Sequence, residues 1–263
     1  MTPNQLFAQL WDRYAGLNPR AQEINDLLEK RGERVINDHI AFRTLNDERL
    51  GIDHLAKVFL SVGYEPQDTY TFEEKKLFAR YYAHKDPAQP KVFISELLLE
   101  EFSADLQHKM RGLVDQLSPE QLADPMLLNA GRLWQTSHAD YEALYAESEY
   151  AAWVSAFGFC ANHFTVYVNA LKTFEMLEEL ASFVEDAGHP MNRSGGLIKG
   201  SPAVYLEQCS TMATEIPVTF TDGTSRLPSC FYEFAKRYPM PKGDLYQGFV
   251  AASADKIFES TNR

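Results

Sequence analysis

The feature that most constrains this chain is a pair of nearly matching segments, NDHIAFR at residues 37–43 and ANHFTVYV at residues 161–168. In each segment a histidine, His39 or His163, begins an alternating apolar run that is typical of a β-strand. A helical pattern follows each run and ends at a glycine after almost the same distance, at Gly63 and at Gly188. Two such modules can bring their histidines together across a pseudo-twofold axis. The repeat therefore predicts a shared metal site.

The remaining pattern predicts an α+β protein that forms a single domain over residues 1–263. We expect N-terminal helices within 3–31, a first module at 35–102, a helical insertion at 103–157, a second module at 159–242 and a tail at 243–263 with a helix at 254–260. The first module should contain a strand at 39–45, a helix at 52–62 and strands near 69–72, 76–83 and 91–99. The second should contain a strand at 162–169, a helix at 171–187, a loop at 192–200 and strands at 203–209, 215–220 and 229–238.

The composition excludes several classes of partner. The formal net charge is −12 and the sequence pI is about 5.1, which disfavours electrostatic binding to nucleic acid or to an anionic membrane surface. No stretch approaches the roughly 18 apolar residues of a membrane span, and the N-terminus lacks the features of a signal peptide. The three cysteines show no metal-binding spacing, so we expect a cytoplasmic protein with reduced thiols.

Two histidines do not complete a metal site, and a carboxylate on a neighbouring strand is the expected third ligand. Three glutamates in apolar strands compete for this role: Glu233, Glu207 and Glu96. Glu233 is favoured because its strand ends the second module, where closing the sheet would place it beside the first strand and His163. Glu96, in the corresponding strand of the first module, remains open as a fourth ligand, and Glu207 remains open as an alternative.

Arg43 follows His39 by four residues, so both side chains should point to the same face of one strand. A planar guanidinium binds carboxylates through two hydrogen bonds, which makes Arg43 a candidate for holding an acidic substrate. An ordinary surface arginine is the alternative. The chain has no phosphate-binding glycine loop, no nucleophile elbow and no dinucleotide fingerprint.

These segments, together with YLEQ at 205–208, RLP at 226–228 and FYEF at 231–234, resemble the bacterial 2-oxoadipate dioxygenase/decarboxylase family. The resemblance runs from about residue 35 to the C-terminus and implies two vicinal-oxygen-chelate-like βαβββ modules, which form a curved mixed sheet around a metal cavity. It also implies Fe(II) held by His39, His163 and Glu233, and a substrate carboxylate anchored by Arg43. The run VAASA at 250–254 resembles a substrate-contacting segment, which makes Ser253 a further candidate.

The resemblance thus implies an Fe(II)-dependent enzyme of lysine catabolism that uses O2 to convert a 2-oxo dicarboxylic acid to CO2 and a 2-hydroxy acid one carbon shorter. The chain is shorter than the characterised enzymes, and Ala252 stands where a valine is expected, so the exact substrate stays open. Two histidines and a glutamate also suit Zn, Ni or Mn. One alternative is a glyoxalase-type isomerase or lyase with four ligands, and another is a non-enzymatic binding protein of the same fold. The sequence does not indicate the oligomeric state.

Overall fold

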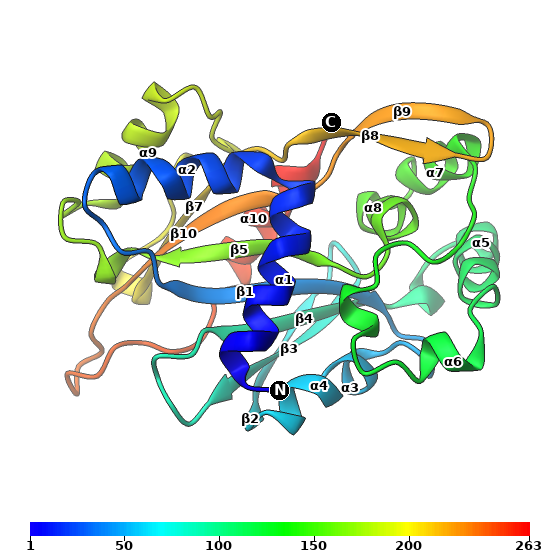
Figure 1. Ribbon diagram of the computed structural model, residues 1–263, viewed down its shortest axis with the longest axis horizontal. Coiled ribbons are helices and arrows are strands. Elements are labelled where there is room, and N and C mark those ends of the chain that lie inside the picture. Colours follow the sequence, from blue (N-terminus) through cyan, green and yellow to red (C-terminus); the bar gives the residue numbers. More distant parts are fainter.

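The computed structural model describes all 263 residues, and its centre is one curved eight-stranded sheet (Figure 1). The strands lie in the order β2-β3-β4-β1-β5-β10-β7-β6. Their bounds are β1 Asn37–Leu45, β2 Tyr64–Phe72, β3 Leu77–His84, β4 Lys91–Leu97, β5 Ala161–Tyr167, β6 Lys199–Ser201, β7 Leu206–Ser210 and β10 Phe231–Arg237. The two histidine-bearing strands, β1 and β5, pair antiparallel at the centre. Each then pairs in parallel with the last strand of its own module, β4 or β10.

This order has the predicted pseudo-twofold symmetry, and it confirms the α+β fold with two βαβββ modules. The helical part of the first module is split into α3 (Ile52–Leu55) and α4 (Lys57–Ser61), and the helix of the second is α9 (Leu177–Asp186). The antiparallel β1–β5 pair is where the two modules join. The histidines of both modules therefore lie near the middle of the sheet.

One expected strand is not part of the main sheet. The segment at 215–220 does form a strand, but this strand, β8 (Glu215–Phe220), pairs only with β9 (Gly223–Pro228) in a separate hairpin. The side chains of β8 alternate, since Glu215, Pro217 and Thr219 are exposed whereas Val218 and Phe220 are buried. The Phe220 ring packs against Tyr141 of the helical insertion, with 5.8 Å between ring centroids, so the apolar face of β8 is covered outside the main sheet. The edge strand of the second module, which corresponds to β2 in the first, is instead the short strand β6. It lies at the end of the segment 192–200, which is expected to be a loop.

The N-terminal helices cover the face of the sheet opposite to the histidines. In Figure 1, helix α1 (Pro3–Leu17) runs across the strands, and α2 (Pro19–Lys30) lies along the sheet beside β10. The Trp11 ring packs edge-on against Phe164, with 5.1 Å between ring centroids. Because side chains alternate along a strand, Phe164 points away from the face that carries His163 and Thr165. Helix α1 therefore does not cover the histidine face of the sheet, which is covered by other elements.

The helical insertion and the C-terminal segment lie around the histidine face. The insertion contains α5 Ala104–Val114, α6 Pro119–Leu122, α7 His138–Tyr145 and α8 Glu149–Phe157. The C-terminal helix α10 (Ala251–Ile257) packs on β2, β6 and β7, and a short 3-10 turn follows it at Phe258–Thr261. In Figure 1, α10 lies on the opposite side of the sheet from α1 and α2. No helix combines the length and the apolar character needed to cross a membrane.

Candidate metal centre

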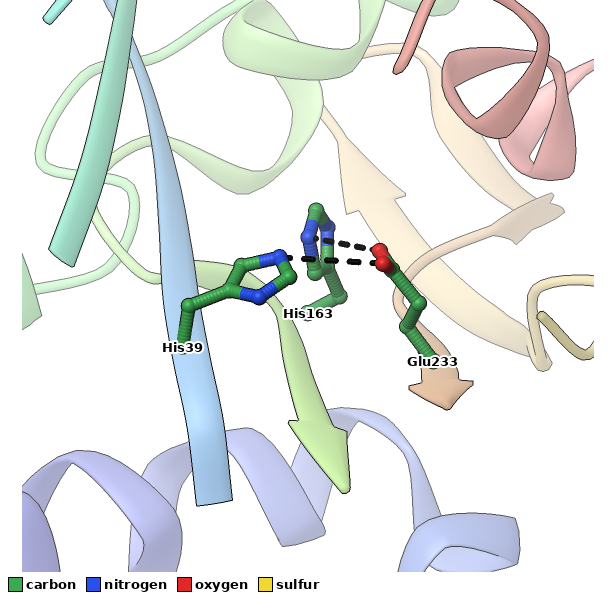
Figure 2. Close-up of side chains that lie close together, drawn as sticks. All are labelled: His39, His163 and Glu233. Atoms are coloured by element: carbon green, nitrogen blue, oxygen red, sulfur yellow. Dashed lines mark ion pairs between the residues drawn. The ribbon is translucent and has the colours of Figure 1, made fainter. Parts of the chain in front are cut away.

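The strand register brings His39, His163 and Glu233 together on one face of the sheet (Figure 2). Thr165 on β5 pairs with His39 on β1 and with Glu233 on β10, so these residues point the same way. One nitrogen or oxygen from each of the three side chains lies within 4.8 Å of the others. His163 Nε2 is 3.1 Å from Glu233 Oε2, and His39 Nε2 is 3.7 Å from Glu233 Oε1. All three residues are buried.

The residue before each histidine determines which ring nitrogen faces the cluster. Asp38 Oδ1 lies 2.8 Å from His39 Nδ1, and Asn162 Oδ1 lies 3.0 Å from His163 Nδ1. These oxygens can only accept, so each Nδ1 carries the proton and donates it. In the neutral imidazole the Nε2 atom is then a lone-pair donor directed at Glu233. This is the arrangement in which histidines bind a metal while a neighbouring group fixes the tautomer.

The charges of the three side chains fit a bound cation. Burial opposes ionisation of Glu233, but His39, His163 and the Gln208 amide outweigh it, and the pKa of Glu233 is lowered from its usual value. Burial lowers the pKa of His163, so this imidazole stays neutral. Gln208 donates a 2.6 Å hydrogen bond to Glu233 Oε1, whereas Glu233 Oε2 is buried without a donor. A divalent metal would supply the missing contact of Oε2.

The pseudo-twofold symmetry also identifies a fourth position, and it holds no ligand. In the second module His163 pairs with Phe231, and Glu233 follows two residues later on β10. In the first module His39 pairs with Lys91, and the residue two positions later on β4 is Phe93. Phe93 thus occupies the place that corresponds to Glu233. The fold offers three protein ligands and not four.

The two competing glutamates do not join this cluster. Glu96 pairs with Thr44, which alternates with Arg43 and so points to the opposite face, and its Oε2 accepts the Ile52 N–H at 2.8 Å. Glu207 is one residue from Gln208 and also points away, where it accepts a 2.6 Å hydrogen bond from the Tyr238 hydroxyl. Glu233 is therefore the carboxylate that the structure places beside both histidines.

Arg43 is buried beside the cluster and most of its donors are already engaged. Nη1 donates to both oxygens of Glu149, at 2.9 and 3.2 Å, and Nη2 donates to Thr261 Oγ1 at 2.9 Å. The guanidinium also lies over the Tyr150 and Trp153 rings. Its Nε is buried and has no hydrogen-bond partner. The Nε–H of Arg43 is thus a strong donor that remains available for an anion.

Ser253 lies on α10 and is buried against Gly200, the middle residue of β6. A side chain at Gly200 would place its Cβ 3.2 Å from Ser253 Oγ and only 2.1 Å from the Leu206 carbonyl oxygen, at a backbone φ of +83°. Gly200 is required there because only glycine allows this approach and this φ. Ser253 is thus held close to the β6–β7 end of the sheet.

Sequence reasoning did not find the ion pair behind His39. Arg237 on β10 donates to both oxygens of Asp38, at 2.6 and 2.8 Å, and also to the carbonyls of Tyr246 and Gly248. The segment that these carbonyls belong to places the Phe249 ring 4.8 Å from the His39 ring. The repeat contained a signal, since Asp38 and Asn162 both precede a histidine, but nothing in the sequence marked Arg237.

Comparison with known proteins identifies the family. Residues 6–244 match the family model of 2-oxoadipate dioxygenase/decarboxylase. The chain belongs to this enzyme family. The chloroplastic 2-oxoadipate dioxygenase/decarboxylase of Arabidopsis thaliana is 35% identical over 284 aligned residues, which cover 97% of this chain and 76% of the relative.

Solved structures agree with the fold. The hydroxyglutarate synthase of Oryza sativa, in complex with 2-oxoadipate, superimposes with a TM-score of 0.92 at 32% identity and covers 98% of this chain and 91% of its own. A protein from Shewanella frigidimarina, described as a candidate hydrolase, superimposes with a TM-score of 0.91 at 52% identity. The match covers 95% of this chain and 98% of that protein. A glyoxalase-superfamily protein from Ralstonia eutropha superimposes with a TM-score of 0.75 at 22% identity, covering 91% of this chain and 83% of that protein. This likeness shows only the type of fold, that of the vicinal-oxygen-chelate proteins.

Proposed function

We propose that this protein is a metal-dependent dioxygenase and decarboxylase. It converts 2-oxoadipate, or a closely related 2-oxo dicarboxylic acid, to CO2 and the 2-hydroxy acid one carbon shorter. The observation that carries the proposal is the set of three ligands, His39, His163 and Glu233, with Phe93 at the fourth symmetric position. Three ligands leave metal positions open for a 2-oxo acid and for O2. The family, and a relative whose structure holds 2-oxoadipate, support this substrate class.

We infer that the metal is Fe(II), because two histidines and one carboxylate with open positions are typical of non-haem iron oxygenases. When bound, Fe(II) supplies the activation of O2. The reaction balances with O2 alone, since the first carbon of the substrate leaves as CO2. One oxygen atom enters the carboxylate formed from the keto carbon, and the other enters the hydroxyl on the neighbouring carbon.

The side chains of the site have separate roles in this proposal. Asp38 and Asn162 keep the Nδ1 protons in place, so both Nε2 lone pairs face the metal. Arg43 offers its unpartnered Nε–H to a substrate carboxylate, and Ser253 contacts the substrate from α10. The Phe249 ring against His39, like the Phe231 ring stacked 4.5 Å from His163, excludes water from the ligands.

Metal analysis and an oxygen electrode test this function. Protein purified without oxygen and loaded with Fe(II) should consume O2 and release CO2 in equal amounts with 2-oxoadipate, and should do neither with adipate, which lacks the keto group. A glyoxalase-type isomerase would transform a substrate with no O2 uptake. A binding protein would bind the 2-oxo acid without turnover. Either result with fully loaded protein would show that the proposed reaction is wrong.

We further propose that the protein acts in the cytoplasm and takes part in lysine breakdown. The cysteines support the location, because Cys160, Cys209 and Cys230 are all buried and unpaired. Cells that lack the protein should accumulate 2-oxoadipate when lysine is the nitrogen source. Cell fractionation with an antibody to the chain tests the location.

A further inference from the structure

Three lysine or arginine residues are buried in this acidic protein, and one of them has no counter-ion. Arg43 is paired with Glu149 at 2.9 Å, and Arg237 is paired with Asp38 at 2.6 Å. Lys199 is only 3% exposed, and no carboxylate oxygen lies within 4.0 Å of its Nζ. A buried charge without a partner is costly unless it meets an anion. Lys199 is therefore the buried cation whose charge remains to be explained.

Lys199 lies on the same side of the sheet as the candidate metal centre. It pairs with Gln208 in the antiparallel β6–β7 ladder, so both side chains point the same way. Gln208 in turn donates to Glu233. Beside Lys199, Gly200 leaves room for the Ser253 hydroxyl. The lysine is thus close to both a metal-facing carboxylate and a candidate substrate contact.

The Lys199 ammonium group retains hydrogen-bonding capacity. Nζ donates to the Asn192 carbonyl at 2.5 Å and, more weakly, to the Leu197 carbonyl at 3.4 Å. An ammonium has three donors, so one remains without a partner. Burial lowers the pKa of Lys199, and Glu233 is among the negative groups that oppose this effect. An anion beside Nζ would use the third donor and balance the charge.

Counting charges in the loaded site shows which anion fits. A divalent metal and Glu233 together give one positive charge, and the Arg43–Glu149 and Asp38–Arg237 pairs are each neutral. A 2-oxo dicarboxylate carries two negative charges, so the site would keep one excess negative charge without Lys199. With Lys199 the sum is zero. A monocarboxylic 2-oxo acid would instead leave Lys199 unbalanced in a buried site.

We propose that Lys199 binds the second carboxylate of the substrate, the one remote from the keto group, and so makes the site selective for dicarboxylic 2-oxo acids. This inference rests on the proposed function, because it assumes that the 2-oxo group binds at His39, His163 and Glu233. The proposal gives Arg43 and Lys199 different roles. Arg43, already neutralised by Glu149, contributes a directed hydrogen bond, whereas Lys199 contributes net charge.

The test compares 2-oxoadipate with 2-oxohexanoate, which has the same chain length but lacks the second carboxylate. Lys199→Met keeps the length of the side chain and removes the charge. It should raise KM and the anaerobic Kd for 2-oxoadipate roughly 10- to 150-fold, the range expected for one charge-assisted contact. Both constants for 2-oxohexanoate should change less than about 3-fold. Lys199→Arg should keep most of the preference for the dicarboxylic acid.

Lys91 provides a matched control, since it is a partly exposed lysine that pairs with His39 in the sheet. Lys91→Met should leave the ratio of the two substrates unchanged. If Lys199→Met loses affinity for both acids equally, the lysine only supports the 192–197 loop. If the ratio of the two affinities changes in Lys91→Met and not in Lys199→Met, the second carboxylate binds elsewhere. If Lys199→Met does not fold, Lys199→Arg provides the test. A Lys199→Arg variant that binds 2-oxoadipate no more tightly than 2-oxohexanoate would overturn the proposal.

The binding measurement keeps this inference distinct from the proposed reaction. Titration calorimetry under argon reports the Kd of each acid whether or not the protein turns it over. Tighter binding of 2-oxoadipate that depends on Lys199, without any O2 uptake, would support the carboxylate site and reject the reaction. O2 uptake with no difference between Lys199→Met and the wild type would support the reaction and reject the carboxylate site.

Discussion

Replacing Arg43 tests how the site recognises its substrate. Two of its nitrogens are held by Glu149 and Thr261, whereas Nε is buried without a partner. The substrate therefore gains one charge-assisted hydrogen bond from Nε, worth about 1.5–3 kcal/mol, or roughly 10- to 150-fold in affinity. Arg43→Lys keeps a positive charge for Glu149 but has no N–H at the position of Nε for the substrate. It should lose nearly the same affinity as Arg43→Ala.

The stability of the variants has to be separated from recognition. Removing Arg43 leaves the Glu149 carboxylate without its partner. Because the Glu149 side chain is 20% exposed, water can solvate it in part, and we expect a loss of about 2 kcal/mol, less than for a fully buried pair. The double variant Arg43→Ala with Glu149→Ala should regain much of this stability. It should not regain substrate affinity, because the Nε donor is still missing.

The assay is a pair of binding and rate measurements on metal-loaded protein, with metal content as the control. If Lys199 holds the remote carboxylate, Arg43 holds the carboxylate next to the keto group. Arg43→Lys should then weaken 2-oxoadipate and 2-oxohexanoate by the same factor, at unchanged metal content. A larger loss for 2-oxoadipate would assign the remote carboxylate to Arg43. Wild-type Kd and KM for both acids in Arg43→Lys would refute any role of the guanidinium in recognition.

Three further predictions concern the metal centre and the ion pair behind it. Glu233→Ala should lose bound metal and activity, whereas Glu207→Ala should keep both, as measured by metal analysis after gel filtration. Phe93→Glu should add a fourth ligand, so the variant should retain metal more tightly than the wild type while O2 uptake falls at least tenfold. Burial raises the pKa of Asp38, but Arg237 outweighs it and holds this pKa well below its usual range. The pair should therefore stabilise the fold fully above about pH 4, the unfolded pKa, and progressively less as pH falls towards the folded pKa. Asp38→Asn should cost about 3–5 kcal/mol near neutral pH and flatten this acid limb in urea unfolding.

The sequence was sufficient for those features that depend on local pattern and repetition. Alternation around His39 and His163 predicted two equivalent strands, and the nearly equal spacing to Gly63 and Gly188 predicted equivalent modules. The choice of Glu233 over Glu207 followed from the expectation that the last strand closes beside the first strand of its module. This pairing is observed, because β10 lies next to β5.

The features that could not be predicted are those that join distant parts of the chain. Arg43 and Glu149 are 106 residues apart, and Asp38 and Arg237 are 199 residues apart. No periodicity links such residues, and opposite charges are common throughout the sequence. The β8–β9 hairpin was misplaced for a related reason, because a strand pattern shows that a segment is extended but not which strand it pairs with.

The main functional consequence of the fold is that a symmetric frame carries an asymmetric site. Both modules supply a histidine from their first strand, but at the next equivalent position the second module has Glu233 and the first has Phe93. Phe93 packs against Phe249, with 4.9 Å between ring centroids, so the first module forms an apolar wall where the second offers charge. Symmetry brings the candidate ligand atoms within 4.8 Å of one another. The break in symmetry at Phe93 would leave positions of a bound metal open. In the proposed function, this one position therefore separates a site that can admit substrate and O2 from one that only holds a metal.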